Sequence, residues 1–107
     1  MKVKWSKHAH TQRLSILRII RHEQGSDVAR RWNGKFAKAV CLLPPFPELG
    51  EEIDEDCYWM LPANHESLRQ MLCSPYRVIY EHVDDEIHIL AIMDCAMLIR
   101  TRDTYWN

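Results

Sequence analysis

The fold is decided by one stretch of the chain, Tyr76-Arg77-Val78-Ile79-Tyr80-Glu81-His82-Val83-Asp84-Asp85-Glu86-Ile87-His88-Ile89-Leu90-Ala91-Ile92-Met93-Asp94. Two runs of β-branched and aromatic residues flank an acidic pair, and such runs favour the pleated, half-buried surface of a sheet. The pattern predicts a β-hairpin of residues 76–83 and 86–94, with its turn at Asp84 and Asp85. An arginine, Arg77, lies inside the first of these strands.

Length and charge limit what the rest of the chain can be. With 107 residues, 47% of them hydrophobic, the chain has the usual size of one domain, so we expect a single domain over residues 1–107. The formal net charge of −1 gives no global attraction to nucleic acid or to an anionic membrane, so any such binding must come from a local patch. We find neither a membrane-spanning run nor a signal peptide and expect a cytoplasmic protein.

The sequence offers no metal or nucleophile motif. Its four cysteines are scattered without a CxxC pair, so we expect reduced thiols and no zinc site; they are Cys41, Cys57, Cys73 and Cys95. His82 and His88 flank the predicted turn and would offer two imidazoles to one ion if they faced each other, but a third ligand is missing. The acidic loop lacks the order of an EF-hand. We therefore predict no cofactor.

Helical periodicity precedes the hairpin. Residues 2–5 alternate as in a short strand, Ser6 offers an N-cap, and apolar residues recur at helical spacing from about Ala9 to Gln24, where Gly25 ends the helix. A second amphipathic helix starts at Ser26 or Asp27 and is stopped by Pro44 and Pro45. Only Gly25 and its neighbours separate the helices, so they should form an antiparallel hairpin. The second helix should pack on the sheet through its apolar stripe around Trp32, which we call the tryptophan stripe and expect in the core.

Between residues 44 and 66 the periodicity is lost, which predicts a loop with an acidic insertion at about residues 48–66. Residues 67–73 then predict a strand that Pro75 ends. The order is β-α-α-β-β-β, an α+β two-layer domain in which the helical hairpin packs on a small, mainly antiparallel sheet. Residues 96–107 would form a short C-terminal tail.

Several motifs in this order resemble the RelE/ParE superfamily of toxins from bacterial type II toxin-antitoxin pairs. Val3-Lys4-Trp5-Ser6 followed by Ala9 is similar to the first strand and helix start of that family, although the expected leucine comes late, at Leu14. Leu42 or Leu43 with Pro47-Glu48-Leu49-Gly50 is similar to its leucine, proline, glycine sequence. Leu68-Arg69 and Tyr76-Arg77-Val78-Ile79-Tyr80 with Asp84-Asp85 are similar to its later strands.

The resemblance implies a small toxin that a cognate antitoxin holds inactive. ParE-like members bind DNA gyrase and poison it. RelE-like members cut mRNA in the ribosomal A site without a metal; they hold phosphate with arginine and lysine and transfer protons with tyrosine, histidine or glutamate. The resemblance therefore implies two different targets, a protein or a translated message.

Arg77 matches the third-strand arginine of the nuclease members, where a guanidinium fork would hold phosphate and stabilise developing charge. Arg69 and Tyr105 complete the candidate catalytic set. The structural alternative for Arg77 is a salt bridge to Glu81 or to cross-strand Glu86. Arg69 would alternatively be structural or contact the antitoxin.

The candidate set for binding nucleic acid or another target is Lys4, Arg100 and Arg102. Lys2 and Lys4 alternatively form a solvated edge that prevents unwanted strand pairing. Arg100, Arg102 and Tyr105 would reach the site only if the tail returns to the sheet.

The chain departs from the family pattern of both branches after the predicted hairpin. Where nuclease members have basic residues, this chain has Asp94-Cys95-Ala96-Met97, and the histidine-rich or arginine-rich endings of gyrase poisons are missing too. We predict a ParE-like toxin that inhibits a protein target such as DNA gyrase. Two alternatives remain open: a RelE-like, ribosome-dependent and metal-independent mRNA endonuclease, and a degenerate, non-toxic homologue that only binds the antitoxin. Whether the protein is an enzyme stays open.

Overall fold

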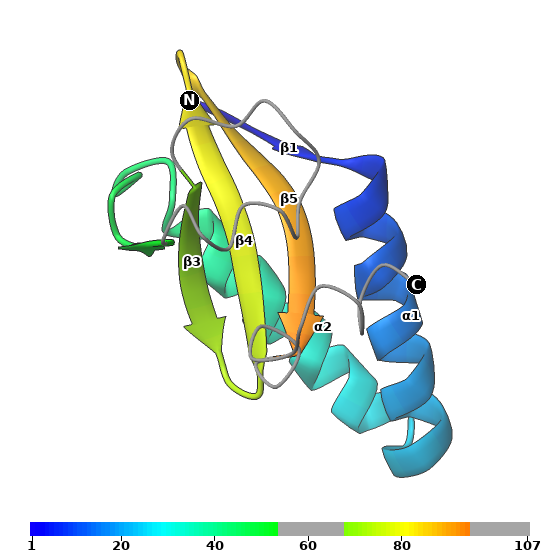
Figure 1. Ribbon diagram of the computed structural model, residues 1–107. Coiled ribbons are helices and arrows are strands. Elements are labelled where there is room, and N and C mark those ends of the chain that lie inside the picture. Colours follow the sequence, from blue (N-terminus) through cyan, green and yellow to red (C-terminus); the bar gives the residue numbers. More distant parts are fainter. Residues whose placement is uncertain (54–67, 95–107) are drawn as a thin grey trace.

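A computed structural model describes residues 1–53 and 68–94 of the chain (Figure 1). These residues form two helices and five strands, in the order β1 (Lys2–Trp5), α1 (Lys7–Gln24), α2 (Ser26–Cys41), β2 (Glu51–Glu52), β3 (Leu68–Cys73), β4 (Tyr76–Val83) and β5 (Glu86–Asp94). Both helices lie on one side of a mainly antiparallel sheet, which confirms the predicted α+β class.

The predicted β-hairpin forms the middle of the sheet. The strand order is β1-β5-β4-β3-β2, in which β1 runs parallel to β5 and every other pair is antiparallel. Tyr76 pairs with Asp94 at one end of the hairpin and Val83 with Glu86 at the other, where Asp84 takes a φ of 54° that aspartate tolerates. The register shifts beside Leu90, so β5 carries a bulge there.

The helices join at Gly25, as predicted. Its φ of 97° lies in the region that favours glycine, and its N–H donates to the carbonyl of Arg21. Ser6 caps α1: its Oγ accepts a hydrogen bond from the Ala9 N–H and donates one to the carbonyl of Leu90, both at 3.0 Å. This serine therefore fixes the start of α1 to β5, and the helix begins two residues before the predicted Ala9.

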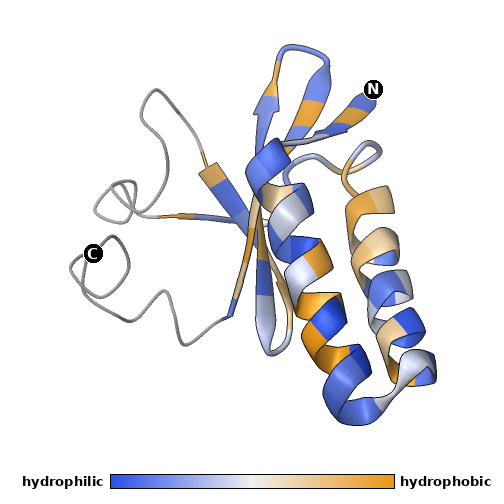
Figure 2. Ribbon diagram, turned by 90° about the vertical axis from the view of Figure 1, so that its right-hand side faces the viewer, coloured by the Kyte–Doolittle hydropathy of each residue, from blue (hydrophilic) through white to orange (hydrophobic). Residues whose placement is uncertain are grey.

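The main core lies between the helices and the sheet. Phe36 and Val40 of α2 pack there with Tyr80 of β4 and with Ile87 and Ile89 of β5. Apolar and polar residues alternate along both helices at helical spacing (Figure 2), although Leu14 and Ile19 of α1 are apolar and exposed. The Trp32 ring meets the Tyr76 ring edge-on at 5.3 Å, so the predicted tryptophan stripe does belong to the core.

The predicted loop after α2 contains an additional strand. Glu51 and Glu52 of β2 pair with Gln70 and Arg69 of β3, which extends the sheet to five strands where four were expected. A two-residue strand has no periodicity of its own, which explains why the sequence did not reveal it. Most of the predicted acidic insertion, from residue 54 to 66, and the predicted tail 96–107 lie outside the described residues.

The described part of the chain contains no helix that is both long enough and apolar enough to cross a membrane. Cys41 and Cys73 are free thiols, and Cys57 and Cys95 lie outside the described residues. Within the described ranges, no three histidines, cysteines or acids are grouped closely enough to hold a metal ion.

Candidate functional site

The predicted site residues have to be located on the two faces of the sheet. Val78 and Tyr80 of β4 belong to the core beneath the helices. Because side chains alternate along a strand, Arg77, Ile79 and Glu81 point to the opposite side, which we call the outer face. The centre of this outer face is apolar and buried, since Leu68, Ile79, Ala91 and Met93 form a second cluster.

Arg77 lies half-buried on the outer face and is held by β3. Its Nη1 donates a hydrogen bond of 2.7 Å to Oε1 of Gln70, and its Nε is buried without a hydrogen-bond partner in residues 1–53 and 68–94. The predicted ion pair with Glu86 is wrong, because the register pairs Arg77 with Met93 and puts Glu86 opposite Val83 at the far end of the hairpin. Arg77 is thus positioned by an uncharged amide.

The other end of the outer face carries alternating charges. Lys4 Nζ lies 2.9 Å from Glu86 Oε2, and the His88 ring lies between Glu81 Oε1 at 3.7 Å and Glu86 Oε1 at 3.9 Å. The hydrogen bond from Lys4 is the largest effect on Glu86 and lowers its pKa. Burial comes next and raises the pKa, and the charges of Lys4, His88 and Lys2 each lower it by less. Lys4, a predicted target-binding residue, is therefore already paired with an acid.

His82 and His88 do not share a site. His82 pairs with Ile87, a core residue, whereas His88 pairs with Glu81 on the outer face. Paired residues point to the same side of a sheet, so the two imidazoles lie on opposite sides. The two-histidine metal site considered from the sequence is excluded by this register.

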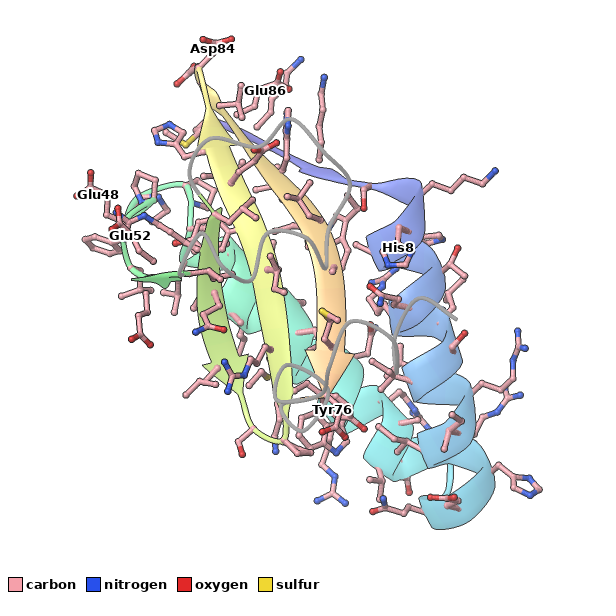
Figure 3. All side chains as sticks on the ribbon, in the orientation of Figure 1. His8, Glu48, Glu52, Tyr76, Asp84 and Glu86 are labelled. Carbon is pink, nitrogen blue, oxygen red and sulfur yellow. The ribbon has the colours of Figure 1, made fainter. Side chains whose placement is uncertain are left out.

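Arg69 lies away from Arg77, although both come from neighbouring strands. It pairs with Tyr80 on the helix side of the sheet, and its Nη1 donates to the backbone oxygens of Gly50 at 2.7 Å and Glu48 at 3.3 Å. Figure 3 shows Glu48 and Glu52 together at this edge of the molecule, far from the turn that carries Asp84 and Glu86. In this arrangement Arg69 holds the loop before β2 and does not lie beside Arg77.

Tyr80 fixes the same loop from the core side. Its hydroxyl donates to the carbonyl of Pro47 and accepts from the N–H of Gly50, both at 2.8 Å, and its ring is fully buried. Burial raises the pKa of Tyr80, although the Gly50 N–H and the charge of Arg69 lower it. We call Tyr80, Arg69 and residues Pro47–Gly50 the Tyr80 cluster.

The Tyr80 cluster gives the proline-glutamate-leucine-glycine motif a structural role. Sequence reasoning noted the motif and Tyr80 but did not connect them. The available signal was that a tyrosine at an inward-facing strand position needs a partner for its hydroxyl. Gly50 and Tyr80 are separated by thirty positions in the chain, so local periodicity could not indicate their contact.

A groove lined by arginines opens between the two helices. Its walls include Leu14, Leu17, Arg18, Arg21, Ala29 and Arg30, and it encloses about 480 Å³. We call it the arginine groove. The net charge of the whole chain conceals this local patch, which a separate count of charges over the two predicted helices indicates.

A second hollow, of about 400 Å³, separates α1 from the end of β5. Ile16, Ile19 and Ile92 give it apolar walls, and Tyr76 closes one side. Gln12 Oε1 accepts a hydrogen bond of 2.9 Å from the Ile92 N–H, which satisfies the edge of β5 that β1 does not reach. The Ile92 N–H is therefore already satisfied and is not available to a ligand in this hollow.

Three predicted site residues, Arg100, Arg102 and Tyr105, lie outside the described residues. Among the others, Arg77 and Lys4 share the outer face, and Arg69 lies on the helix side. The candidate catalytic set therefore stays a prediction for Arg77 and Tyr105, and the observed contacts of Arg69 suit a structural role.

Comparison with known proteins gives one family and a matching fold. Residues 3–99 match the family model described as ParE toxin of type II toxin-antitoxin system, parDE. The chain is similar to a solved structure titled "Chromosomal ParDE TA system from P. aeruginosa", with a TM-score of 0.68 and 20% sequence identity. The superposition covers 88% of this chain and 95% of that one. No curated protein matches the sequence.

Proposed function

Since the chain belongs to the family of ParE toxins from type II toxin-antitoxin systems, we propose that it is held inactive by a cognate antitoxin and arrests growth by inhibiting a protein target such as DNA gyrase. The family match supplies the toxin role. The choice of target rests on the contacts of the cationic side chains.

The single observation that supports a protein target is that these cations are already engaged. Arg77 donates to Gln70, Arg69 to the carbonyls of Glu48 and Gly50, and Lys4 pairs with Glu86. A metal-independent nuclease needs several cations directed at one phosphate, where they stabilise the charge of the transition state. Within the described residues, Arg77 and Arg69 instead lie on opposite sides of the sheet.

The charges at the other end of the outer face, around His88, agree with this choice. Glu81 and Glu86 lie on the same face and flank His88. Much of the affinity of a protein for RNA comes from neutralising phosphates, and nearby carboxylates oppose it. The charged end of the outer face is thus better suited to a protein surface than to a phosphate chain.

Expression of this chain without its antitoxin is expected to arrest growth, and co-expression of the protein encoded in the neighbouring reading frame to restore it. The purified chain should inhibit DNA supercoiling by gyrase in a dose-dependent manner. Chain that has been mixed with its antitoxin beforehand serves as the control and should leave supercoiling unchanged. Normal supercoiling with the free chain in excess over gyrase would exclude gyrase as the target.

A ribosome-dependent mRNA endonuclease is the second candidate. It is favoured by the buried Nε of Arg77, which has no hydrogen-bond partner among the described residues. If this nitrogen contacts a phosphate, Arg77→Gln should lower A-site cleavage of a translated message by roughly 10²–10³-fold, the usual cost of removing one preorganised donor. Primer extension on the message measures the cleavage. Lys7→Gln is the matched control, because Lys7 is exposed on α1 away from this face.

Absence of cleavage by the unaltered chain would eliminate this candidate. Harmless expression together with tight antitoxin binding would contradict both toxic readings. That outcome would favour the non-toxic homologue.

A further inference from the structure

Charge is divided between the two layers of this protein. The helical segment, residues 7–41, contains eight lysines and arginines and two acids, a formal net charge of +6. The remaining residues contain six lysines and arginines and thirteen acids, a net charge of −7. A chain that is nearly neutral overall therefore presents a strongly cationic helical surface.

The arginine groove lies within this cationic surface. Arg18 and Arg21 line it from α1, and Arg30 lines it from α2. The guanidinium groups of Arg18 and Arg21 form no hydrogen bond or ion pair with the side chains or backbone of other described residues. Arg30 pairs with Asp27 at 2.9 Å, but both side chains are largely exposed, and such a pair contributes little and exchanges readily with another carboxylate. Three guanidinium groups are thus available around one hollow.

Beside the arginines and the polar Ser26 and Asn33, the groove has an apolar part, which we call its apolar floor. Leu14 contributes to it although 45% of this residue is exposed, and Leu17 and Ala29 lie beside it. The groove extends along α1 from Leu14 to Arg21, two helical turns or about 10 Å. This length accommodates two turns of a helix or a short extended segment.

We propose that the arginine groove binds an acidic amphipathic segment of the cognate antitoxin. An apolar side chain of that segment covers Leu14 and Leu17, and carboxylates on either side of it pair with Arg18, Arg21 and Arg30. The planar guanidinium fork binds carboxylates in a bidentate way, which gives the contact orientation as well as charge. The proposal rests on the proposed function, since it presupposes that an antitoxin exists.

The apolar floor is the reason for choosing a protein over a nucleic acid. Phosphates would satisfy the three arginines equally well but would leave Leu14 and Leu17 against a polar backbone. An acidic amphipathic segment satisfies both the apolar floor and the cationic rim, as hydrophobic interface centres with polar rims do. Arginines at a rim also accelerate association and make it sensitive to salt.

The test compares two double charge reversals in binding to the antitoxin encoded in the neighbouring reading frame. Arg18→Glu with Arg21→Glu is expected to weaken the antitoxin Kd by roughly 30-fold or more, since both lose a carboxylate partner and gain repulsion. Arg31→Glu with Lys38→Glu makes the same change of net charge on exposed residues of α2 that do not line the groove. This control should change the Kd by less than about 3-fold at about 0.15 M salt, where distant charges are largely screened.

A milder pair, Arg18→Gln with Arg21→Gln, protects the test against misfolding, and circular dichroism of all variants checks the fold. In cells, the groove variants should arrest growth but escape neutralisation by the antitoxin. Unchanged antitoxin affinity in both groove variants would overturn the proposal while leaving the proposed function intact. Unchanged antitoxin affinity with loss of DNA or RNA binding would likewise overturn it and assign the groove to nucleic acid.

If the unaltered chain neither binds the antitoxin nor arrests growth, the proposed function itself fails, and the groove proposal is overturned with it.

Discussion

Replacement of Gly50 by alanine is expected to lower the free energy of unfolding by about 3 kcal/mol, a large part of the 5–15 kcal/mol that holds a domain of this kind together. A Cβ at this position would stand 2.6 Å from Cε1 of Tyr80, 2.7 Å from its hydroxyl oxygen and 2.8 Å from the backbone oxygen of Gln70. The buried ring and the strand backbone have no room to move. Overpacking costs about 1–3 kcal/mol, and the Gly50–Tyr80 hydrogen bond adds about 1 kcal/mol.

Urea unfolding measures this loss, and Gly34→Ala is its matched control. Gly34 lies inside α2, and a Cβ there would meet nothing within 4 Å. Alanine is the better helix former by about 0.5–1 kcal/mol, so this variant should be more stable than the parent chain. A Gly50→Ala chain as stable as the parent would show that the loop before β2 is not held against Tyr80.

The β-hairpin and the second helix were predictable because each has its own periodicity. Ile87 and Ile89 alternate with polar neighbours, and Phe36 and Val40 recur at helical spacing. These patterns place a residue on the inside or outside of its own element without reference to any other element. The same logic placed the turn at Asp84 and Asp85 and the helix junction at Gly25.

The loop before β2 was not predictable in this way. Its shape depends on Tyr80 and Arg69, which come later in the chain. They bind backbone carbonyls and a backbone N–H, groups that almost any residue type offers. Backbone groups have no sequence signature, so only Gly50 indicated that the loop could approach another part of the chain closely. Arg69 pairs with the inward-facing Tyr80, and Arg77 pairs with Leu72 of the opposite face. The two arginines therefore lie on opposite faces of the sheet, but this follows only when the register of the strands is known.

The arginine groove illustrates a third case. Arg18 and Arg21 lie outside the apolar stripe of the first predicted helix, a position where solvated cations are ordinary. Their meaning depends on Arg30, which faces them from the other helix. A surface assembled from two elements becomes predictable only when the crossing of those elements is known.

Replacement of Tyr80 by phenylalanine is expected to lower the free energy of unfolding by about 2–3 kcal/mol at pH 7. The ring still fills the core, but the carbonyl of Pro47 loses a donor and the N–H of Gly50 loses an acceptor. An unsatisfied buried polar group costs about 1–3 kcal/mol. Tyr76→Phe is the control: within the described residues its hydroxyl forms no hydrogen bond, so its loss should change stability by less than about 0.5 kcal/mol at this pH.

The pH dependence gives the Tyr80→Phe variant a second signature. Burial raises the pKa of Tyr80, so the folded state keeps this proton at pH values where the unfolded chain, with a tyrosine pKa of about 10, has begun to lose it. The stabilisation is complete below that pH and declines as the pH rises above it. The parent chain should thus lose stability above about pH 10 more steeply than Tyr80→Phe. Equal slopes in the two chains would mean that the hydroxyl of Tyr80 is reached by water in the folded state, and the cluster around it would then have to be looser than its 2.8 Å contacts indicate.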